Sequence, residues 1–178
     1  DCAQPFIVME YIEGSTLEEL LNKKPSMEVG KAARIIRDIA LALDKAHEIS
    51  VIHRDIKPAN IMLTPEGVPK LIDFGLARAE NDTSISIAGM AIGTPQYMAP
   101  EQWGKNRVDV RCDIFSLGVT FYELVTGILP FPFADKAARK RSIQEMLERA
   151  CPRPRDLAAE LSEEMQLVIF RMLEPDRN

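Results

Sequence analysis

The sequence predicts a mainly α-helical domain with a few short β-hairpins. Two segments carry most of this prediction. Residues 27–49 have apolar side chains at helical spacing, and residues 113–124 are apolar almost all round, as expected of a helix buried at the centre of a helical domain. Between them, short apolar runs are separated by a turn at residues 65–67, which favours a small hairpin. The 178 residues are enough for one domain with a proper core.

The first predicted elements are a strand and two helices. Residues 6–11 form a short apolar strand candidate that has no earlier strand to pair with. Ser15, followed three residues later by Glu18, predicts a capping box at the start of a short helix that runs through Leu21. Ser26 is the predicted cap of a longer helix. Its apolar stripe comprises Val29, Ala32, Ile35, Ile36, Ile39, Leu43 and Ala46.

Short strands are then predicted around Val51 and at residues 61–63 and 69–72. Residues 76–100 lack periodicity, and a loop of that length is usually functional or mobile. Gly127 should end the central helix.

Two further helices are expected in the last third of the chain, at residues 137–150 and 162–173. Ser162 is the predicted cap of the second one. Its predicted inner stripe is Met165, Val168, Ile169, Met172 and Leu173.

Composition excludes several classes of protein. The net charge of −5 disfavours nonspecific binding to nucleic acid or anionic membranes, and the one basic cluster, residues 139–141, is interpreted as a solvated helix face. Three widely spaced cysteines argue against a disulfide framework or a zinc site and fit a reducing cytoplasm. No apolar run approaches the roughly 20 residues of a membrane span.

Polar residues at 55, 57, 60 and 73 predict chemistry. If the strand pair after Asn60 doubles back, Asp73 returns beside it, and the two side chains offer the oxygen ligands that Mg²⁺ prefers. Asp55 is then free to accept a proton, and Lys57 can bind a phosphate oxygen. Such a set suits phosphoryl transfer, which needs positioning and charge stabilisation. Each residue alone is more commonly a turn or cap residue, so the prediction depends on their order and spacing.

Five motifs in order resemble those of the eukaryotic-type serine/threonine protein kinases, and the bacterial members in particular. They are HRDIKPAN (53–60), DFG (73–75), GTPQYMAPE (93–101), DIFSLG (113–118) and TGILPF (126–131). The resemblance spans essentially the whole chain and implies the α+β large lobe (C-lobe) of the kinase fold.

The resemblance implies two unequal parts. Residues 1–14 would be the hinge strand remnant of the small lobe (N-lobe), and residues 15–178 the large lobe, truncated before its last helix.

The resemblance also implies roles for individual residues. Asp55 would be the catalytic base, Lys57 would steady the γ-phosphate of ATP, and Asn60 and Asp73 would hold Mg²⁺. Thr94 would hydrogen-bond toward Asp55 and Lys57, which is the pattern of serine/threonine kinases rather than tyrosine kinases.

The adenine of ATP would lie against the hinge. Met9 resembles the gatekeeper residue, the backbone of Glu10 and Ile12 would face adenine, and Met62 would pack beneath it.

Other residues would have structural or regulatory roles. His53 and Phe74, which precedes Gly75, would belong to the apolar spine of the active state, Asp113 would brace the 53–60 loop, and Glu101 would pair with an arginine beyond the next-to-last helix. His47 is expected to be an exposed helix residue.

Arg54 matches kinases whose activation loop is ordered by phosphorylation. Thr83, Ser84 and Ser86 are the candidate acceptors, with Ser86 favoured for its distance before Thr94.

The sequence departs from the family at its beginning, because it contains neither a Gly-rich loop nor the strand lysine and helix glutamate that hold ATP. We therefore expect the isolated segment to be inactive and the protein from which it comes to be an ATP- and Mg²⁺-dependent kinase of protein substrates. The missing small lobe is the partner that this large lobe requires. Two alternatives are a pseudokinase or scaffold that binds partners without catalysis, and a small-molecule phosphotransferase.

Overall fold

The computed structural model describes residues 8–74, 95–103, 108–131 and 153–174. In chain order its elements are β1 (Ser15–Thr16), α1 (Leu17–Lys23), α2 (Val29–Glu48), η1 (Pro58–Asn60), β2 (Ile61–Leu63), β3 (Pro69–Leu71), η3 (Pro95–Tyr97), η4 (Pro100–Trp103), α3 (Arg111–Thr126), α5 (Pro154–Leu157) and α6 (Glu163–Leu173), where η denotes a 3₁₀ helix. This α-rich arrangement with one small sheet confirms the predicted fold class. Among the described helices, none combines the length and apolar character that crossing a membrane requires.

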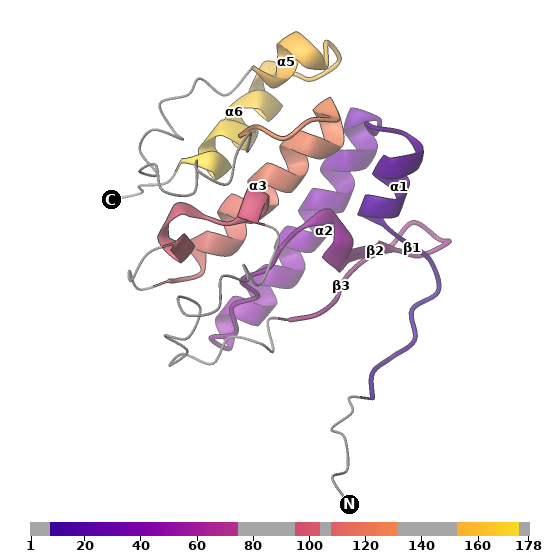
Figure 1. Ribbon diagram of the computed structural model, residues 1–178, viewed down its shortest axis with the longest axis vertical. Helices are drawn as coiled ribbons and strands as arrows, with labels where there is room; N and C mark the ends of the chain where they lie inside the picture. The colour runs from indigo at the N-terminus through magenta and orange to yellow at the C-terminus, as the bar shows by residue number, and fades with distance from the viewer. Residues whose placement is uncertain (1–7, 75–94, 104–107, 132–152, 175–178) are drawn as a thin grey trace, which may run out of the picture.

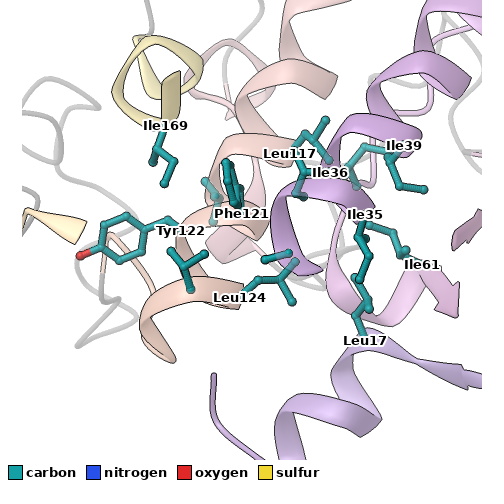
Figure 2. Packing of buried hydrophobic residues seen from close by; sticks show 14 of the residues in the cluster. Leu17, Ile35, Ile36, Ile39, Ile61, Leu117, Phe121, Tyr122, Leu124 and Ile169 are labelled. Carbon is teal, nitrogen blue, oxygen red and sulfur yellow. The ribbon is translucent and has the colours of Figure 1, made fainter. Parts of the chain in front are cut away.

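Helix α3 is the centre of the fold. It packs against α2 on one side and α6 on the other (Figure 1). Figure 2 shows Leu117 of α3 facing Ile36 of α2, while Ile169 of α6 points toward Phe121 and Tyr122. Because α3 is surrounded, an apolar residue is needed on almost every side of it, which explains its near-continuous apolar sequence.

Helix α2 buries the predicted stripe. The buried members are Val29, Ala32, Ile35, Ile36, Ile39 and Leu43, and Ala46 is half-buried. The opposite face of the helix is mainly polar, with Leu41 as an exposed exception, so its 3.6-residue periodicity identified which side would contact the core.

The cap of α1 lies one residue later than predicted. Thr16 accepts a hydrogen bond from the Glu19 amide at 3.1 Å, and Glu19 accepts one from the Thr16 amide at 3.1 Å. The predicted pair of Ser15 and Glu18 is wrong, because α1 begins at Leu17 and Thr16 is the residue directly before it. Both pairs have capping-box spacing, and both Ser15 and Thr16 pair with β2, so neither the spacing nor the sheet register distinguishes them.

The predicted cap of α2, Ser26, is also wrong. The Met27 amide donates to the Leu124 carbonyl at 2.7 Å, which ties this segment to the end of α3 before the helix begins. Glu28 is the cap, and its side chain accepts from the Gly30 amide at 2.9 Å.

The sheet has the antiparallel order β1-β2-β3, with Ile61 opposite Leu71. The predicted strands at 61–63 and 69–72 are therefore confirmed, the second one being a residue shorter. No strand is present at Val51, whose amide donates to the Ala46 carbonyl and closes the end of α2. The described part of the predicted 6–11 strand, residues 8–11, is also not a strand.

The ends of α3 and α6 agree with prediction. Gly127 ends α3 with φ +77°, and its amide donates to the Glu123 carbonyl at 2.8 Å. Ser162 caps α6. The prediction that Val168 belongs to the inner stripe of α6 is wrong, because Val168 is 51% exposed while Ile169 is buried. The predicted helix at 137–150 lies outside the described residues, and α5 was not predicted.

Gly118 lets α3 and α6 approach closely. A Cβ atom at this position would lie 2.7 Å from the Cβ of Met172. We expect Gly118→Ala to lower the free energy of unfolding by about 1–3 kcal/mol, measured by urea denaturation. Gly67→Ala is the control, since its Cβ would meet nothing within 4 Å and only its positive φ opposes the change. Equal losses in the two variants would contradict close packing at Gly118.

Candidate active site

Residues 53–60, the 53–60 loop, are held against the first turn of α3. The Asp113 carboxylate accepts hydrogen bonds from the backbone amides of His53 at 2.9 Å and Arg54 at 2.7 Å. Asp113 is fully buried, so these charge-assisted bonds are shielded from water. One side chain thus sets the direction of two successive peptide groups at the start of the loop.

Two residues of the candidate site have backbone angles that side-chain-bearing residues rarely adopt. Arg54 has φ +68° and Asp73 has φ +57°. Such conformations typically cost about 1–3 kcal/mol and persist only where the surroundings impose them. The Asp113 bond to the Arg54 amide is one such restraint.

Asp55 lies within a compact polar set. Its Oδ2 atom accepts from Lys57 Nζ at 2.7 Å and from Asn60 Nδ2 at 2.9 Å, and Asn60 Nδ2 also donates to the Asp55 backbone carbonyl at 2.8 Å. The side chain of Asp55 is 35% exposed. The carboxylate is therefore oriented by two donors while it stays accessible to another molecule.

The hairpin brings the second carboxylate back, as the sequence predicted. The Ile72 amide donates to the Asn60 carbonyl at 2.9 Å, so Asp73 follows directly after a residue bonded to Asn60. The amide nitrogen of Asn60 is used by Asp55, and its side-chain oxygen accepts no hydrogen bond within the described part of the chain. Asp73 is exposed.

Those two oxygen donors fit a hard cation such as Mg²⁺ that is also held by phosphate and water. The described residues contain no cluster of three or more His, Cys, Asp or Glu that could hold a metal by protein ligands alone.

His53 is buried and bonded through both ring nitrogens. Its Nε2 lies 3.0 Å from the Ile72 carbonyl, and its Nδ1 accepts from the Asp55 amide at 3.3 Å. A carbonyl can only accept and an amide can only donate, so the ring is neutral with its proton on Nε2. Burial lowers the pKa of His53 below its usual value. The ring also contacts Phe74, with 4.8 Å between centroids.

This neutral histidine predicts a pH dependence of stability. The folded chain binds a proton on His53 less readily than the unfolded chain does. The contribution of the neutral His53 ring to the free energy of unfolding is therefore complete above about pH 6.5 and declines as the pH falls below that value. An NMR titration would follow the two histidines of the chain, with His47→Gln assigning the signals. A His53 ring that titrates at or above its usual pKa would contradict this account.

His47 is a site residue that the sequence prediction missed. Its Nε2 lies 2.8 Å from Asp113 Oδ2, and its side chain is only 14% exposed, so the expectation of an exposed helix residue is wrong. The sequence could have predicted the burial of His47, because it lies four residues after Leu43 and therefore on the buried face of α2.

A second missed pair joins η3 to α3. The Tyr97 hydroxyl donates to Glu123 Oε2 at 2.6 Å. Burial raises the pKa of both groups, so Tyr97 keeps its proton and acts as the donor. This bond anchors the described part of the GTPQYMAPE segment to the central helix.

The residues predicted to face adenine lie along the first described segment and the sheet. Met9 is 65% exposed, Ile12 and Met62 are half-buried, and Glu10 forms an ion pair with Lys70. Their contact with a nucleotide stays a prediction.

The remaining predicted residues are only partly described. Glu101 lies half-buried in η4. The others lie outside the described residues: Gly75, Thr83, Ser84, Ser86 and Thr94.

An α-rich lobe that sets an aspartate, a lysine and an asparagine in one loop, with a second aspartate after a hairpin, is the arrangement expected of the large lobe of a protein kinase. The chain belongs to the protein kinase domain family, which it matches over residues 2–178.

Several curated proteins that this chain resembles are named serine/threonine-protein kinases. The chain is 39% identical over 171 residues to the serine/threonine-protein kinase PknB of Mycolicibacterium smegmatis, covering 95% of this chain and 27% of that protein. It is 36% identical over 171 residues to a probable serine/threonine-protein kinase of Clostridium perfringens, and the match covers 96% of this chain and 24% of that protein. The chain is 44% identical over 128 residues to the serine/threonine-protein kinase PknB of Mycobacterium leprae, and the match covers 71% of this chain and 21% of that protein. The chain thus spans about a quarter of the length of these relatives.

Proposed function

We propose that this chain is the catalytic large lobe of a serine/threonine protein kinase, which transfers the γ-phosphate of ATP to serine or threonine hydroxyls of proteins. The observation that carries the proposal is the hydrogen-bonded set of Asp55, Lys57 and Asn60, in a loop whose first amides are held by the buried Asp113. The printed names of the relatives support the choice of serine/threonine acceptors.

Asp55 and Lys57 of the 53–60 loop have proposed tasks in the transfer step. Asp55 receives the proton of the substrate hydroxyl, since its carboxylate is accessible and held by two donors. Lys57 lies within hydrogen-bond distance of that carboxylate and carries the positive charge that a phosphate oxygen would attract. Thr94 is proposed to hydrogen-bond toward both.

Asn60 and Asp73 are the proposed Mg²⁺ ligands. When bound, the ion would neutralise charge on the phosphate groups. The Asn60 side chain suits this task because Asp55 occupies its nitrogen and leaves its oxygen available.

The nucleotide is proposed to lie along residues 9–12 and Met62. The division into a hinge remnant, residues 1–14, and a large lobe, residues 15–178, belongs to the same proposal. The charge and the cysteine pattern support action on proteins, rather than nucleic acid, in the reducing cytoplasm.

Ser86 is the proposed activating phosphorylation site. Arg54 is proposed to be among the residues that bind its phosphate group, because arginine forms strong charge-assisted hydrogen bonds with phosphate. Mass spectrometry of the complete protein after incubation with ATP should find phosphate at Ser86. An activated protein that carries no phosphate in residues 76–92 would refute the assignment.

A phosphotransfer assay tests the function. The complete protein, incubated with ATP and Mg²⁺, should label a generic protein substrate and leave small-molecule acceptors unlabelled. Labelling of small molecules alone would support a small-molecule phosphotransferase, and no labelling under any condition would support a pseudokinase or scaffold.

The 178-residue chain alone should not transfer phosphate, because its sequence contains no Gly-rich loop and no strand lysine to hold ATP. The same assay with the isolated chain checks this, with the complete protein as the positive control. Labelling by the isolated chain that disappears in Asp55→Asn would show the expectation to be wrong.

A further inference from the structure

We propose that Gln102 is a positioning residue for Asp55, acting through the peptide bond that precedes it. This inference rests on the proposed function, in which Asp55 receives the substrate proton. Gln102 lies in η4, 48 residues along the chain from the loop residue that it contacts.

The side-chain amide of Gln102 joins two separate segments. Its Nε2 donates to the Arg54 carbonyl at 2.9 Å, and its Oε1 accepts from the Ala99 amide at 2.9 Å. The Ala99 amide can only donate and the Arg54 carbonyl can only accept, so the orientation of the Gln102 amide is unambiguous. Gln102 is half-buried and Ala99 is fully buried, which limits the water available to replace these bonds.

The bond to Arg54 restrains the peptide group that leads into Asp55. The carbonyl of that peptide accepts from Gln102, and its amide, which belongs to Asp55, donates to His53 Nδ1 at 3.3 Å. A peptide group is planar, so holding both of its polar ends fixes the plane from which the Asp55 side chain projects. Arg54 needs such restraint because its φ is +68°.

Glutamine meets a requirement here that glutamate cannot. Either residue could accept from the Ala99 amide three positions earlier, in the manner of a capping box. Only the glutamine amide can also donate to the Arg54 carbonyl, whereas a carboxylate would place a negative oxygen against that carbonyl oxygen. The bond to the 53–60 loop therefore explains the amide at this position.

Gln102 also lies next to a segment that is fixed to the central helix. It follows directly after the GTPQYMAPE segment, which Tyr97 anchors to α3. The Gln102 amide thus connects this segment to the loop that carries the proposed base, and its loss should affect the transfer step more than nucleotide binding.

The test compares Gln102→Glu and Gln102→Met in the complete protein. Gln102→Glu keeps the acceptor and loses the donor, and Gln102→Met keeps the approximate volume and loses both. We expect Gln102→Glu to lower kcat by about 10- to 100-fold with little change in the KM for ATP, and Gln102→Met to lower it less. Gln166→Glu is the charge-matched control, since Gln166 lies on α6 and its side chain makes one hydrogen bond in the described chain, accepting from the Arg155 amide at 3.3 Å.

Hydrogen exchange provides a readout that does not depend on activity. Loss of the donor should speed exchange of the Asp55 amide in both Gln102 variants and not in Gln166→Glu. Wild-type kcat in both Gln102 variants, or a loss fully explained by the unfolded fraction, would overturn the inference. If the unmodified protein transfers no phosphate, the proposed function fails, and unchanged exchange at Asp55 would separately refute the role of Gln102.

Discussion

Asp55→Asn is expected to lower kcat of the complete protein by about 10²- to 10⁴-fold, the usual contribution of a general base. Asparagine has nearly the same shape and can still accept from Lys57 or Asn60, which now donate to Asp55 Oδ2 at 2.7 and 2.9 Å. It has no basic carboxylate to receive a proton. The measurement is steady-state phosphorylation of a protein substrate at saturating ATP.

The matched control for this variant is Asp109→Asn. Asp109 is an exposed residue just before α3, and its side chain accepts from the Arg111 amide at 2.9 Å. Its replacement should leave kcat unchanged. An Asp55→Asn variant with the thermal stability and the kcat of the unmodified protein would exclude Asp55 as the base.

Asp113→Ala should damage both folding and activity. Removal of this carboxylate leaves the buried amides of His53 and Arg54 without their acceptor and takes away the partner of His47. Each unsatisfied buried donor typically costs 1–3 kcal/mol, so the free energy of unfolding should fall by roughly 2–6 kcal/mol. The 53–60 loop would lose its support, and kcat should fall by about 10²-fold or more in the protein that remains folded.

Urea denaturation and the phosphotransfer assay measure the two effects of Asp113→Ala separately. Asp109→Ala is the control here, because it removes a carboxylate from the same end of α3 without touching the loop. Asp113→Asn should be intermediate, since it keeps the shape and one acceptor oxygen. Equal stability losses in Asp113→Ala and Asp109→Ala would show that Asp113 does not brace the loop.

Periodicity predicted the helices well and their first residues poorly. The stripe of α2 and the end of α3 at Gly127 follow from local rules, because burial of one face and a left-handed cap leave regular marks in sequence. The caps of α1 and α2 were misplaced because several neighbouring side chains could have served. The start of α1 at Leu17 made Thr16 its cap, and the bond from Met27 to Leu124 holds the segment before α2 against α3.

Within the site, the order and spacing of Asp55, Lys57, Asn60 and Asp73 were enough to predict phosphoryl transfer, because those side chains lie in one loop or just after one hairpin. The return of Asp73 to the neighbourhood of Asn60 required only that the hairpin form. Local sequence thus specified which groups would carry the proposed chemistry.

The tertiary structure alone decided how those groups are supported. Asp113 contacts His53 and Arg54 from about 60 residues further along the chain, and His47 and Gln102 also reach the site from other helices. The physical reason is that a buried backbone amide or carbonyl needs a partner but does not specify which distant side chain will provide it. That choice depends on how α2, α3 and η4 pack around the 53–60 loop.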